Sequence, residues 1–286
     1  IMKSGAHDYL MKGNLARLVP AVEREVREAR DRTRHREAES ALHAANEQMR
    51  IAREIQQRLF PENPPDLAGY DLAGLTESAE ETGGDYYDFI PMSGGDYGLV
   101  VGDVTGHGIG PALLMAETRA YLRILAADFD DVSEILTRAN RVLNEDTGSE
   151  RFVTLLFVRF NPTAMTVRYA SAGHPPALWL DRDGKLKKEL KRTGMPLGVK
   201  PDTQYTVSED LPLEQGDLLA LMTDGVEEST AEDGELFGKE RIVQTLSSHQ
   251  VESAGEIVVG LHEASRSHEA ANHQPDDFTT IVLKVD

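Results

Sequence analysis

Apolar residues recur at steps of three and four along residues 14–59, where Pro20 is the one residue that disfavours a helix, and a first helical turn tolerates it. The seam consists of Leu15, Val19, Val22, Val26, Ala29 and Thr33, and then of Leu42, Ala45, Met49, Ala52, Ile55 and Leu59. Spacing of about 3.5 residues over several heptads predicts a coiled coil, with a phase slip near residues 34–41.

A lone helix of this length would leave its apolar stripe in water, so the pattern favours a parallel homodimer through the N-terminal helix. A single helix packed on its own domain is the alternative that the pattern leaves open. The helix is expected to end at Pro61, because a proline disfavours helical conformation in the residue before it. The run PENPPDLAG that starts there is predicted to be an extended joint.

Beyond this joint the pattern changes to short apolar strands, turns and two sequential pairs of helices. Strands are expected at 70–76, 86–91, 97–103, 152–160, 164–171, 176–181, 205–209, 217–223 and 278–285, and helices at 109–127, 132–146, 238–247 and 253–268. Turns such as Asp183-Gly184 are typical of antiparallel hairpins. Because strands outnumber helices and do not alternate with them, we expect an α+β fold, an α-β-β-α sandwich of two antiparallel sheets flanked by helices.

Charge is distributed unevenly along the chain. Residues 1–60 hold 12 Lys+Arg and 9 Asp+Glu, whereas residues 61–286 hold 18 and 40, a net charge of −22. Phosphate contacts need clustered cations, so the acidic body argues against nucleic-acid binding, and no helix-turn-helix pattern is present. The lack of cysteine excludes disulfides and thiolate metal ligands and fits a reducing cytoplasm. We expect no membrane partner, because no signal peptide and no apolar run of about 18 residues is recognisable.

The opening run GAHDYLMK resembles the last strand of a bacterial response-regulator receiver domain, which carries the pattern GAxDYLxK. In that resemblance Lys12 matches the active-site lysine of the receiver, and the phosphoacceptor aspartate would lie upstream. The sequence therefore predicts three parts: a receiver remnant at 1–30, a coiled-coil linker helix at 31–60 and a catalytic domain at 61–286.

Aspartates stand at the ends of several apolar strands, mostly beside glycines. They are Asp85, Asp103, Asp224, Asp276 and Asp277. Short carboxylates in such places can project into one cleft, and oxygen ligands suit the hard cations Mg²⁺ and Mn²⁺. We expect these aspartates to converge on a pair of divalent cations. Turn capping is the alternative for any one of them, since Asp beside Gly is a common turn pair.

Six motifs then occur in the order found in PPM-type metal-dependent serine/threonine phosphatases. They are GGDYYD, GDVTGHG, SAGHPPAL, TGMPLGV, TDGVEE and DDFTTIVLKV. Each motif alone is weak, but six in order make the chain from AREIQQRLFP to the C-terminus resemble this family, and most of all its bacterial SpoIIE/RsbU-like branch. With the receiver remnant, the layout is similar to that of receiver-linked phosphatases of the RssB/RsbU type, which act on regulators of sigma factors.

The resemblance implies two Mn²⁺ or Mg²⁺ ions that activate a shared water for in-line attack on a phosphoryl group, without a covalent enzyme intermediate. The metal and catalytic positions that it implies are Asp85, Asp103, Val104, Asp224 and Asp276. Asp103 would bridge both ions, and the carbonyl of Val104 would bind one of them. Asp277 competes with Asp276, because adjacent side chains in an extended strand point to opposite sides.

The remaining marked residues receive mainly structural interpretations. Gly83, Gly84, Gly106 and Gly108 are expected to supply positive φ or close backbone approach. His107 could protonate the leaving oxygen, although a buried structural role is favoured. His174 is expected to fix a hairpin, Thr105 to cap the next helix, and Asp88 to lie at the surface or in a cap, with water-mediated metal contact as its alternative. No basic residue stands close to the motifs, so the metals are expected to carry most of the phosphate charge.

Together these inferences predict a phosphoserine/phosphothreonine protein phosphatase controlled by a receiver domain through the coiled coil. Control would move residues 51–60 against the catalytic domain. The substrate that the resemblance implies is a phosphorylated anti-sigma-factor antagonist of the STAS type. The alternative is a catalytically silent pseudophosphatase that binds a regulator, which the four matched aspartates disfavour.

Overall fold

The long helix α1 (Leu18–Gln57) opens the part of the chain that the computed structural model describes, residues 18–147, 151–270 and 276–286. The chain divides into two units, 1–51 and 52–286. Lys12 and the receiver-like run lie outside the described residues, and the predicted divisions at residues 30 and 60 stay predictions. The predicted helix is confirmed, and it ends four residues before Pro61.

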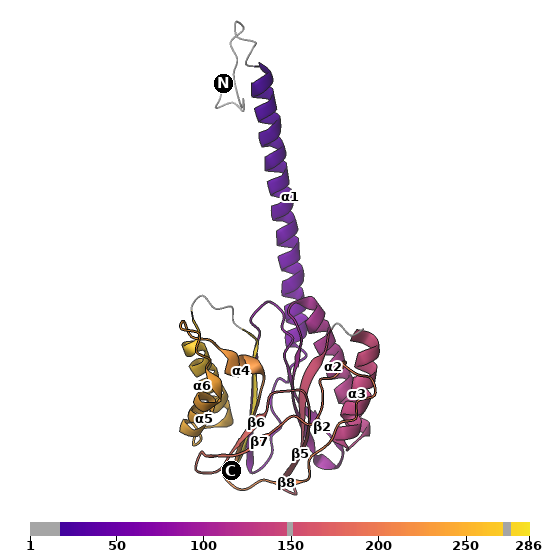
Figure 1. The fold of residues 1–286 in the computed structure, drawn as a ribbon, viewed down its shortest axis with the longest axis vertical. Coiled ribbons are helices and arrows are strands. Elements are labelled where there is room, and N and C mark those ends of the chain that lie inside the picture. The colour runs from indigo at the N-terminus through magenta and orange to yellow at the C-terminus, as the bar shows by residue number, and fades with distance from the viewer. Residues whose placement is uncertain (1–17, 148–150, 271–275) are drawn as a thin grey trace. The chain divides into compact units, whose positions relative to one another are not determined.

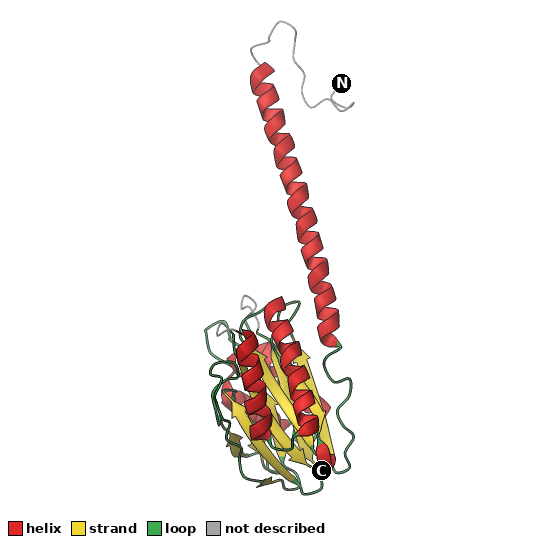
Figure 2. Ribbon diagram, turned by 90° about the vertical axis from the view of Figure 1, so that its right-hand side faces the viewer, coloured by secondary structure: helices red, strands yellow, loops and turns green. Residues whose placement is uncertain are grey.

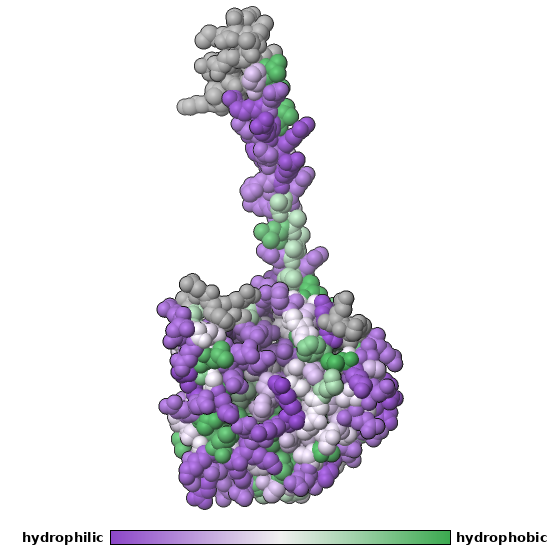
Figure 3. All heavy atoms as spheres, in the orientation of Figure 1, coloured by the Kyte–Doolittle hydropathy of each residue, from purple (hydrophilic) through white to green (hydrophobic). Residues whose placement is uncertain are grey.

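Apolar side chains lie among polar ones along α1 (Figure 3), and several of the predicted seam are exposed, Leu42 by 63% and Ile55 by 59%. This exposure is what a coiled coil needs before its partner is added, and the coiled coil itself stays a prediction. Leu59 was assigned to the same seam. It follows the helix and packs, with Phe60, against the core of the second unit.

Ten strands and five further α-helices build the second unit within the described residues. The strands are β1 (Tyr70–Glu77), β2 (Tyr86–Pro91), β3 (Tyr97–Val104), β4 (Val153–Asn161), β5 (Thr166–Ala172), β6 (Ala177–Leu180), β7 (Leu186–Leu190), β8 (Leu211–Pro212), β9 (Leu218–Met222) and β10 (Phe278–Val285). The helices are α2 (Ile109–Asp128), α3 (Val132–Thr147), α4 (Asp224–Glu228), α5 (Gly238–Ser248) and α6 (Ala254–His268), with a 3₁₀ turn η3 at Ser93–Gly95.

The strands form two antiparallel five-stranded sheets, ordered β1-β10-β9-β6-β7 and β2-β3-β4-β5-β8. Helices α5 and α6 cover the outer face of the first sheet, and α2 and α3 cover the outer face of the second (Figures 1 and 2). The predicted α-β-β-α sandwich is therefore confirmed.

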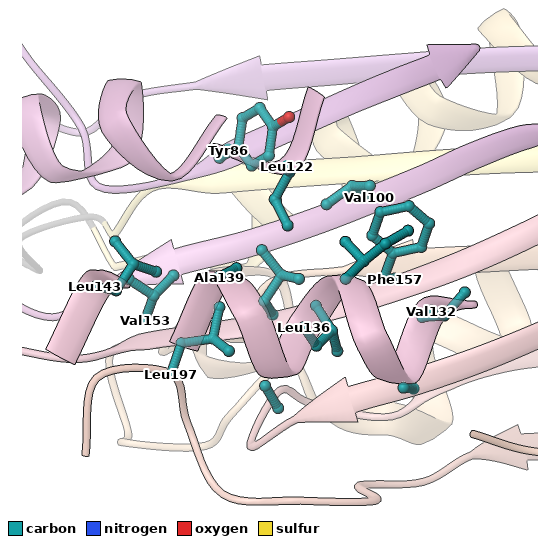
Figure 4. Packing of buried hydrophobic residues seen from close by; sticks show 14 of the residues in the cluster. Tyr86, Val100, Leu122, Val132, Leu136, Ala139, Leu143, Val153, Phe157 and Leu197 are labelled. Atoms are coloured by element: carbon teal, nitrogen blue, oxygen red, sulfur yellow. The ribbon is translucent and has the colours of Figure 1, made fainter. Parts of the chain in front are cut away.

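Side-chain alternation explains how the layers are held together. In β3, Val100 faces α2 and α3, whereas Leu99 and Val101 face the other sheet. Figure 4 shows α3 laying Leu136, Ala139 and Leu143 against this sheet; with Val153 and Phe157 of β4, they belong to one fully buried cluster. Because successive strand residues point to opposite faces, each apolar strand of this sheet contributes side chains to two hydrophobic cores.

Three local predictions differ from the structure. β7 was missed because its sequence, LKKEL, is polar and mostly exposed, so it lacks an apolar signal. α4 has five residues, too few to show a helical period. The strand expected at 205–209 is absent; that segment touches β5 through the bond from Ser208 N to Tyr169 O, and the short β8 pairs with β5 instead.

In the part of the chain that the structure describes, every helix is too short or too polar to cross a membrane. The cytoplasmic location stays a prediction.

Candidate active site

The two sheets bring five aspartates, two from one sheet and three from the other, to the same edge of the sandwich. Asp103 lies near the end of β3, and Asp85 immediately precedes β2, the strand paired with β3. Asp224 begins α4 directly after β9, and Asp276 and Asp277 directly precede β10, which pairs with β9. Antiparallel pairing thus places the start of one strand beside the end of its neighbour in both sheets.

Glycines let these turns approach each other without side chains between them. A Cβ atom at Gly84 would lie 2.5 Å from the Val104 carbonyl oxygen and 3.3 Å from Asp103 Oδ1. A Cβ atom at Gly225 would lie 2.1 Å from the Asp277 carbonyl oxygen. The predicted close approach is confirmed at Gly83 and Gly84, and positive φ is confirmed at Gly106 and Gly108.

Asp85 is buried, and one hydrogen bond ties it to the other sheet. Thr223 Oγ1 donates to Asp85 Oδ2 at 2.8 Å, and Thr223 Oγ1 accepts from Thr279 N at 3.2 Å. Burial raises the pKa of Asp85 well above its usual value, and the charges of Asp103 and Asp277 raise it further.

The adjacent aspartates at the start of β10 have different surroundings. Asp277 Oδ1 accepts from Ala79 N at 2.8 Å, and Asp277 Oδ2 accepts from Gly84 N at 2.9 Å. Asp276 is exposed, and its Oδ1 accepts from the backbone N–H of Asp277. Asp277 therefore holds the turn before Asp85, and the second oxygen of Asp276 has no hydrogen-bond partner among the described residues.

Mutual repulsion among the carboxylates is the main electrostatic feature of the site. Burial raises the pKa of Asp103 to about 7, with further contributions from the charges of Asp224, Asp276 and Asp277. Burial and the charge of Asp276 also raise the pKa of Asp224. Bound cations would relieve this repulsion, and an all-oxygen donor set suits Mg²⁺ or Mn²⁺, so the residues fit such ions. Among the described residues, no three acidic or histidine side chains already stand as a complete ligand set.

A cavity of about 420 Å³ adjoins Asp103, Asp276 and Asp277, whereas Asp85 and Asp224 are not among the described residues that line it. Six of the residues that line it are acidic: Glu80, Asp103, Glu228, Glu269, Asp276 and Asp277. No described lysine or arginine lines it. His107 stands at the wall with Nδ1 3.2 Å from Glu80 Oε2, and its side chain is 80% exposed. The expectation of a buried structural His107 was therefore wrong, and the imidazole is available to a ligand in the cavity.

Asp88 and Thr105 also differ from expectation. Asp88 is fully buried, and both of its oxygens accept hydrogen bonds from Arg123 at 2.6 Å. It therefore joins β2 to α2 instead of lying at the surface or near a metal ion. A buried carboxylate needs such a partner to offset its desolvation. Thr105 Oγ1 exchanges hydrogen bonds with the backbone of Phe152, and Gly108 is the residue that precedes α2.

His174 is a buried connector beneath the site, as expected for a structural residue. Its Nδ1 lies 2.9 Å from Thr154 Oγ1 and its Nε2 lies 3.1 Å from the Met222 carbonyl oxygen, so it joins the two sheets. Burial lowers its pKa to about 3, which keeps the ring neutral at physiological pH.

Two residues near the site were not singled out from the sequence. Gln56, in the last turn of α1 and 6% exposed, donates from Nε2 to the Gly83 carbonyl at 2.7 Å and accepts from Gly83 N at 3.2 Å. Arg192 donates from Nε to the His174 carbonyl at 3.3 Å. The apolar period marked only the neighbours of Gln56, and Arg192 stands immediately before TGMPLGV without a motif of its own.

Comparison with protein families and curated proteins gives a consistent assignment. The family described as Stage II sporulation protein E (SpoIIE) matches residues 93–286. The phosphoserine phosphatase RsbU of Bacillus subtilis is 29% identical over 238 residues, which cover 83% of this chain and 70% of RsbU. Protein IcfG of Synechocystis sp. is 29% identical over 259 residues, which cover 81% of this chain and 40% of IcfG.

Solved structures share the fold. The SiaA-PP2C domain of Pseudomonas aeruginosa has a TM-score of 0.75 at 23% identity, covering 86% of this chain and 99% of that domain. RsbX in complex with magnesium has a TM-score of 0.57 at 18% identity, covering 78% of this chain and 99% of RsbX. At these identities the likeness establishes the fold alone.

Proposed function

The chain belongs to the SpoIIE family of PP2C-type protein serine/threonine phosphatases, and from this membership we propose that it removes phosphate from phosphoserine or phosphothreonine of a protein substrate with the help of two divalent cations. The observation that carries the proposal is the gathering of Asp85, Asp103, Asp224 and Asp276 from two sheets at one edge of the sandwich, where Asp103 and Asp276 line the acidic cavity. A fold alone would not need carboxylates whose charges raise the pKa values of Asp85, Asp103 and Asp224.

The cations would be Mn²⁺ or Mg²⁺, held by Asp103 between them and by the Val104 carbonyl, Asp224 and Asp276, with Asp85 binding directly or through water. RsbX, which shares the fold, is described in complex with magnesium. When bound, such ions lower the pKa of a coordinated water and neutralise charge on phosphoryl oxygens. Asp276 is preferred to Asp277, because backbone N–H groups engage both oxygens of Asp277.

The chain's own residues would do the remaining work. Thr223 and Asp277 hold the Asp85 turn in place. His107, exposed at the cavity wall and 3.2 Å from Glu80, would give a proton to the departing seryl or threonyl oxygen.

We infer the substrate class from the relatives. RsbU is named a phosphoserine phosphatase, and the receiver-linked phosphatases that the layout of this chain resembles act on regulators of sigma factors. A phosphorylated STAS-type anti-sigma-factor antagonist is therefore the substrate we propose. The cavity is wide and open to solvent, which suits a phosphorylated side chain presented on a folded partner better than a small enclosed metabolite.

Control by an upstream receiver domain is proposed to act through α1, as a parallel homodimer of the helix. The contact of Gln56 with Gly83 supports this part of the proposal, because it connects the last turn of α1 to the turn that carries Asp85. Because Asp85 is two residues from Gly83, a shift or rotation of that helical turn would change the position of a proposed metal ligand.

Hydrolysis of p-nitrophenyl phosphate with and without Mn²⁺ tests the catalytic proposal. Asp103→Asn is expected to lower kcat by at least about a hundredfold, and the matched variant Asp128→Asn, an exposed aspartate at the end of α2, is expected to be unchanged. Equal and metal-independent rates for the wild type and Asp103→Asn would leave the pseudophosphatase as the better account.

A further inference from the structure

Arg192 is exposed, and one described hydrogen bond, from its Nε, holds its side chain. It lies two residues after β7, and its Nε donates to the carbonyl of His174 at 3.3 Å. No described aspartate or glutamate forms an ion pair with it, although the second unit carries a strong excess of acidic residues. Nε–H is one of the five N–H groups of a guanidinium, so the terminal nitrogens retain free donors.

Contacts place Arg192 beside the aspartates. His174, whose carbonyl it binds, also contacts Thr154 Oγ1 and the Met222 carbonyl. Thr154 is the cross-strand partner of Asp103 in the β3–β4 ladder, and Met222 ends β9 two residues before Asp224. Directly opposite residues in such a ladder have Cα atoms about 4.5–5.5 Å apart.

Strand pairing gives the same placement. Ala177, which begins β6, pairs with Leu190, the last residue of β7, and Leu178 pairs with Ala220 of β9. The chain that leaves β7 and carries Arg192 therefore lies at the edge of the sheet where β9 ends, two residues before Asp224.

We propose that Arg192 is a substrate-binding residue whose terminal N–H groups bind non-bridging oxygens of the phosphoryl group. This inference rests on the proposed phosphatase function, since it concerns the same site. The cavity is lined by six acidic residues and no described lysine or arginine, so it would repel a phosphoryl dianion wherever cations do not offset its charge. Arg192 supplies a fixed positive charge at that edge, and its planar fork matches two phosphoryl oxygens.

A purely structural arginine would behave differently. The loss of its one described hydrogen bond, to the His174 carbonyl, would appear in thermal stability alone. A phosphoryl-binding arginine changes the KM of every phosphorylated substrate, whatever its leaving group. It also changes the affinity for inorganic phosphate, which presents the same oxygens.

The test compares wild type with Arg192→Gln, Arg192→Lys and the control Lys191→Gln, which removes the same charge from the exposed neighbour. Each Mn²⁺-loaded protein is assayed with p-nitrophenyl phosphate and a phosphoserine peptide. The dissociation constant of inorganic phosphate is measured by calorimetry.

We expect Arg192→Gln to raise both KM values and the phosphate dissociation constant by at least about tenfold, with kcat changed less. Arg192→Lys should restore part of the loss, and Lys191→Gln should have no effect.

The outcomes separate this inference from the function on which it rests. Loss of peptide affinity alone, with p-nitrophenyl phosphate and phosphate binding unchanged, would mean that Arg192 contacts a flanking carboxylate and would overturn the proposal. Equal changes in Arg192→Gln and Lys191→Gln would reduce the effect to general charge and would also overturn it. A wild type that binds phosphate through Arg192 but hydrolyses neither substrate would refute the phosphatase and leave the anion site standing. Thermal unfolding of each variant verifies that it is folded, and Arg192→Lys keeps the test decisive if Arg192→Gln is not.

Discussion

Gln56 holds both polar backbone atoms of Gly83, the first residue of the turn that carries Asp85. Its side-chain amide donates to the Gly83 carbonyl at 2.7 Å and accepts from the Gly83 N–H at 3.2 Å. The pair is buried, so neither backbone group has water as a substitute partner. The last turn of α1 is thus built into the site and is more than a linker to it.

Gln56→Ala is expected to weaken the response to metal. Removing the amide leaves two buried backbone groups of Gly83 without partners, each of which costs about 1–3 kcal/mol, and the turn will move to find new ones. Because Asp85 is two residues from Gly83, we expect the Mn²⁺ concentration for half-maximal hydrolysis of p-nitrophenyl phosphate to rise by about tenfold or more.

The neighbouring Gln57 is exposed and provides the control for this measurement. Gln57→Ala should leave the Mn²⁺ dependence unchanged. If Gln56→Ala lowered thermal stability but kept the Mn²⁺ response of the wild type, the contact would serve folding only, and the proposed coupling between α1 and the site would lose its support.

The sequence was sufficient to predict the sandwich and to mark the aspartates as candidates, whose metal role stays a prediction. Strands such as β3 can be recognised in the sequence because their residues are apolar on both faces, and Asp103 is marked by the glycines around it. Gln56 and Arg192 could not be found in this way. Their roles depend on contacts with Gly83 and His174, which are 27 and 18 residues away, and no local period encodes such contacts.

Exposure was the other property that motifs did not supply. His107 and His174 both stand beside glycines, yet one is 80% exposed and the other fully buried. The difference arises because His174 lies between the sheets, where its two ring nitrogens form hydrogen bonds with Thr154 and Met222. His107 lies in the exposed turn after β3.

Asp276 and Asp277 are expected to fail in different ways when each is changed to Asn. Asp276→Asn should raise the Mn²⁺ requirement by at least about tenfold with little change in stability, because its side chain is exposed. Asp277→Asn should lower the free energy of unfolding by about 1–3 kcal/mol, because an amide cannot accept from both Ala79 N and Gly84 N. Metal titration and urea unfolding distinguish them, and the reverse pattern would make Asp277 the ligand.

His174 should make the fold sensitive to mild acid. In the unfolded chain an imidazole with a pKa near 6.5 takes up a proton as pH falls below that value, whereas burial holds the pKa of His174 at about 3 in the folded state. The unfolded state therefore binds more protons between these values, and the free energy of unfolding falls as pH decreases. The contribution is at most about 1.4 kcal/mol per pH unit.

Urea unfolding between about pH 5 and 6.5 measures this slope. His174→Gln should flatten it, while His107→Gln, which changes an exposed imidazole, should keep it. Parallel pH dependences in all three proteins would show that other groups account for the loss of stability in acid.

The exposed seam of α1 gives the last prediction, which concerns assembly. Leu42 and Ile55 are apolar and exposed in a single chain, and a parallel partner helix would bury them, with each fully buried side chain of this kind worth about 1.5–3 kcal/mol. Light scattering should therefore give twice the 31.5 kDa of one chain. Leu42→Lys combined with Ile55→Lys should give the monomer, because two lysines would place like charges across the seam. Ala44→Lys, at an exposed position about 200° around the helix from Leu42, should remain a dimer. A wild type of monomeric mass would favour the single-helix alternative, and control by an upstream domain would then have to act within one chain.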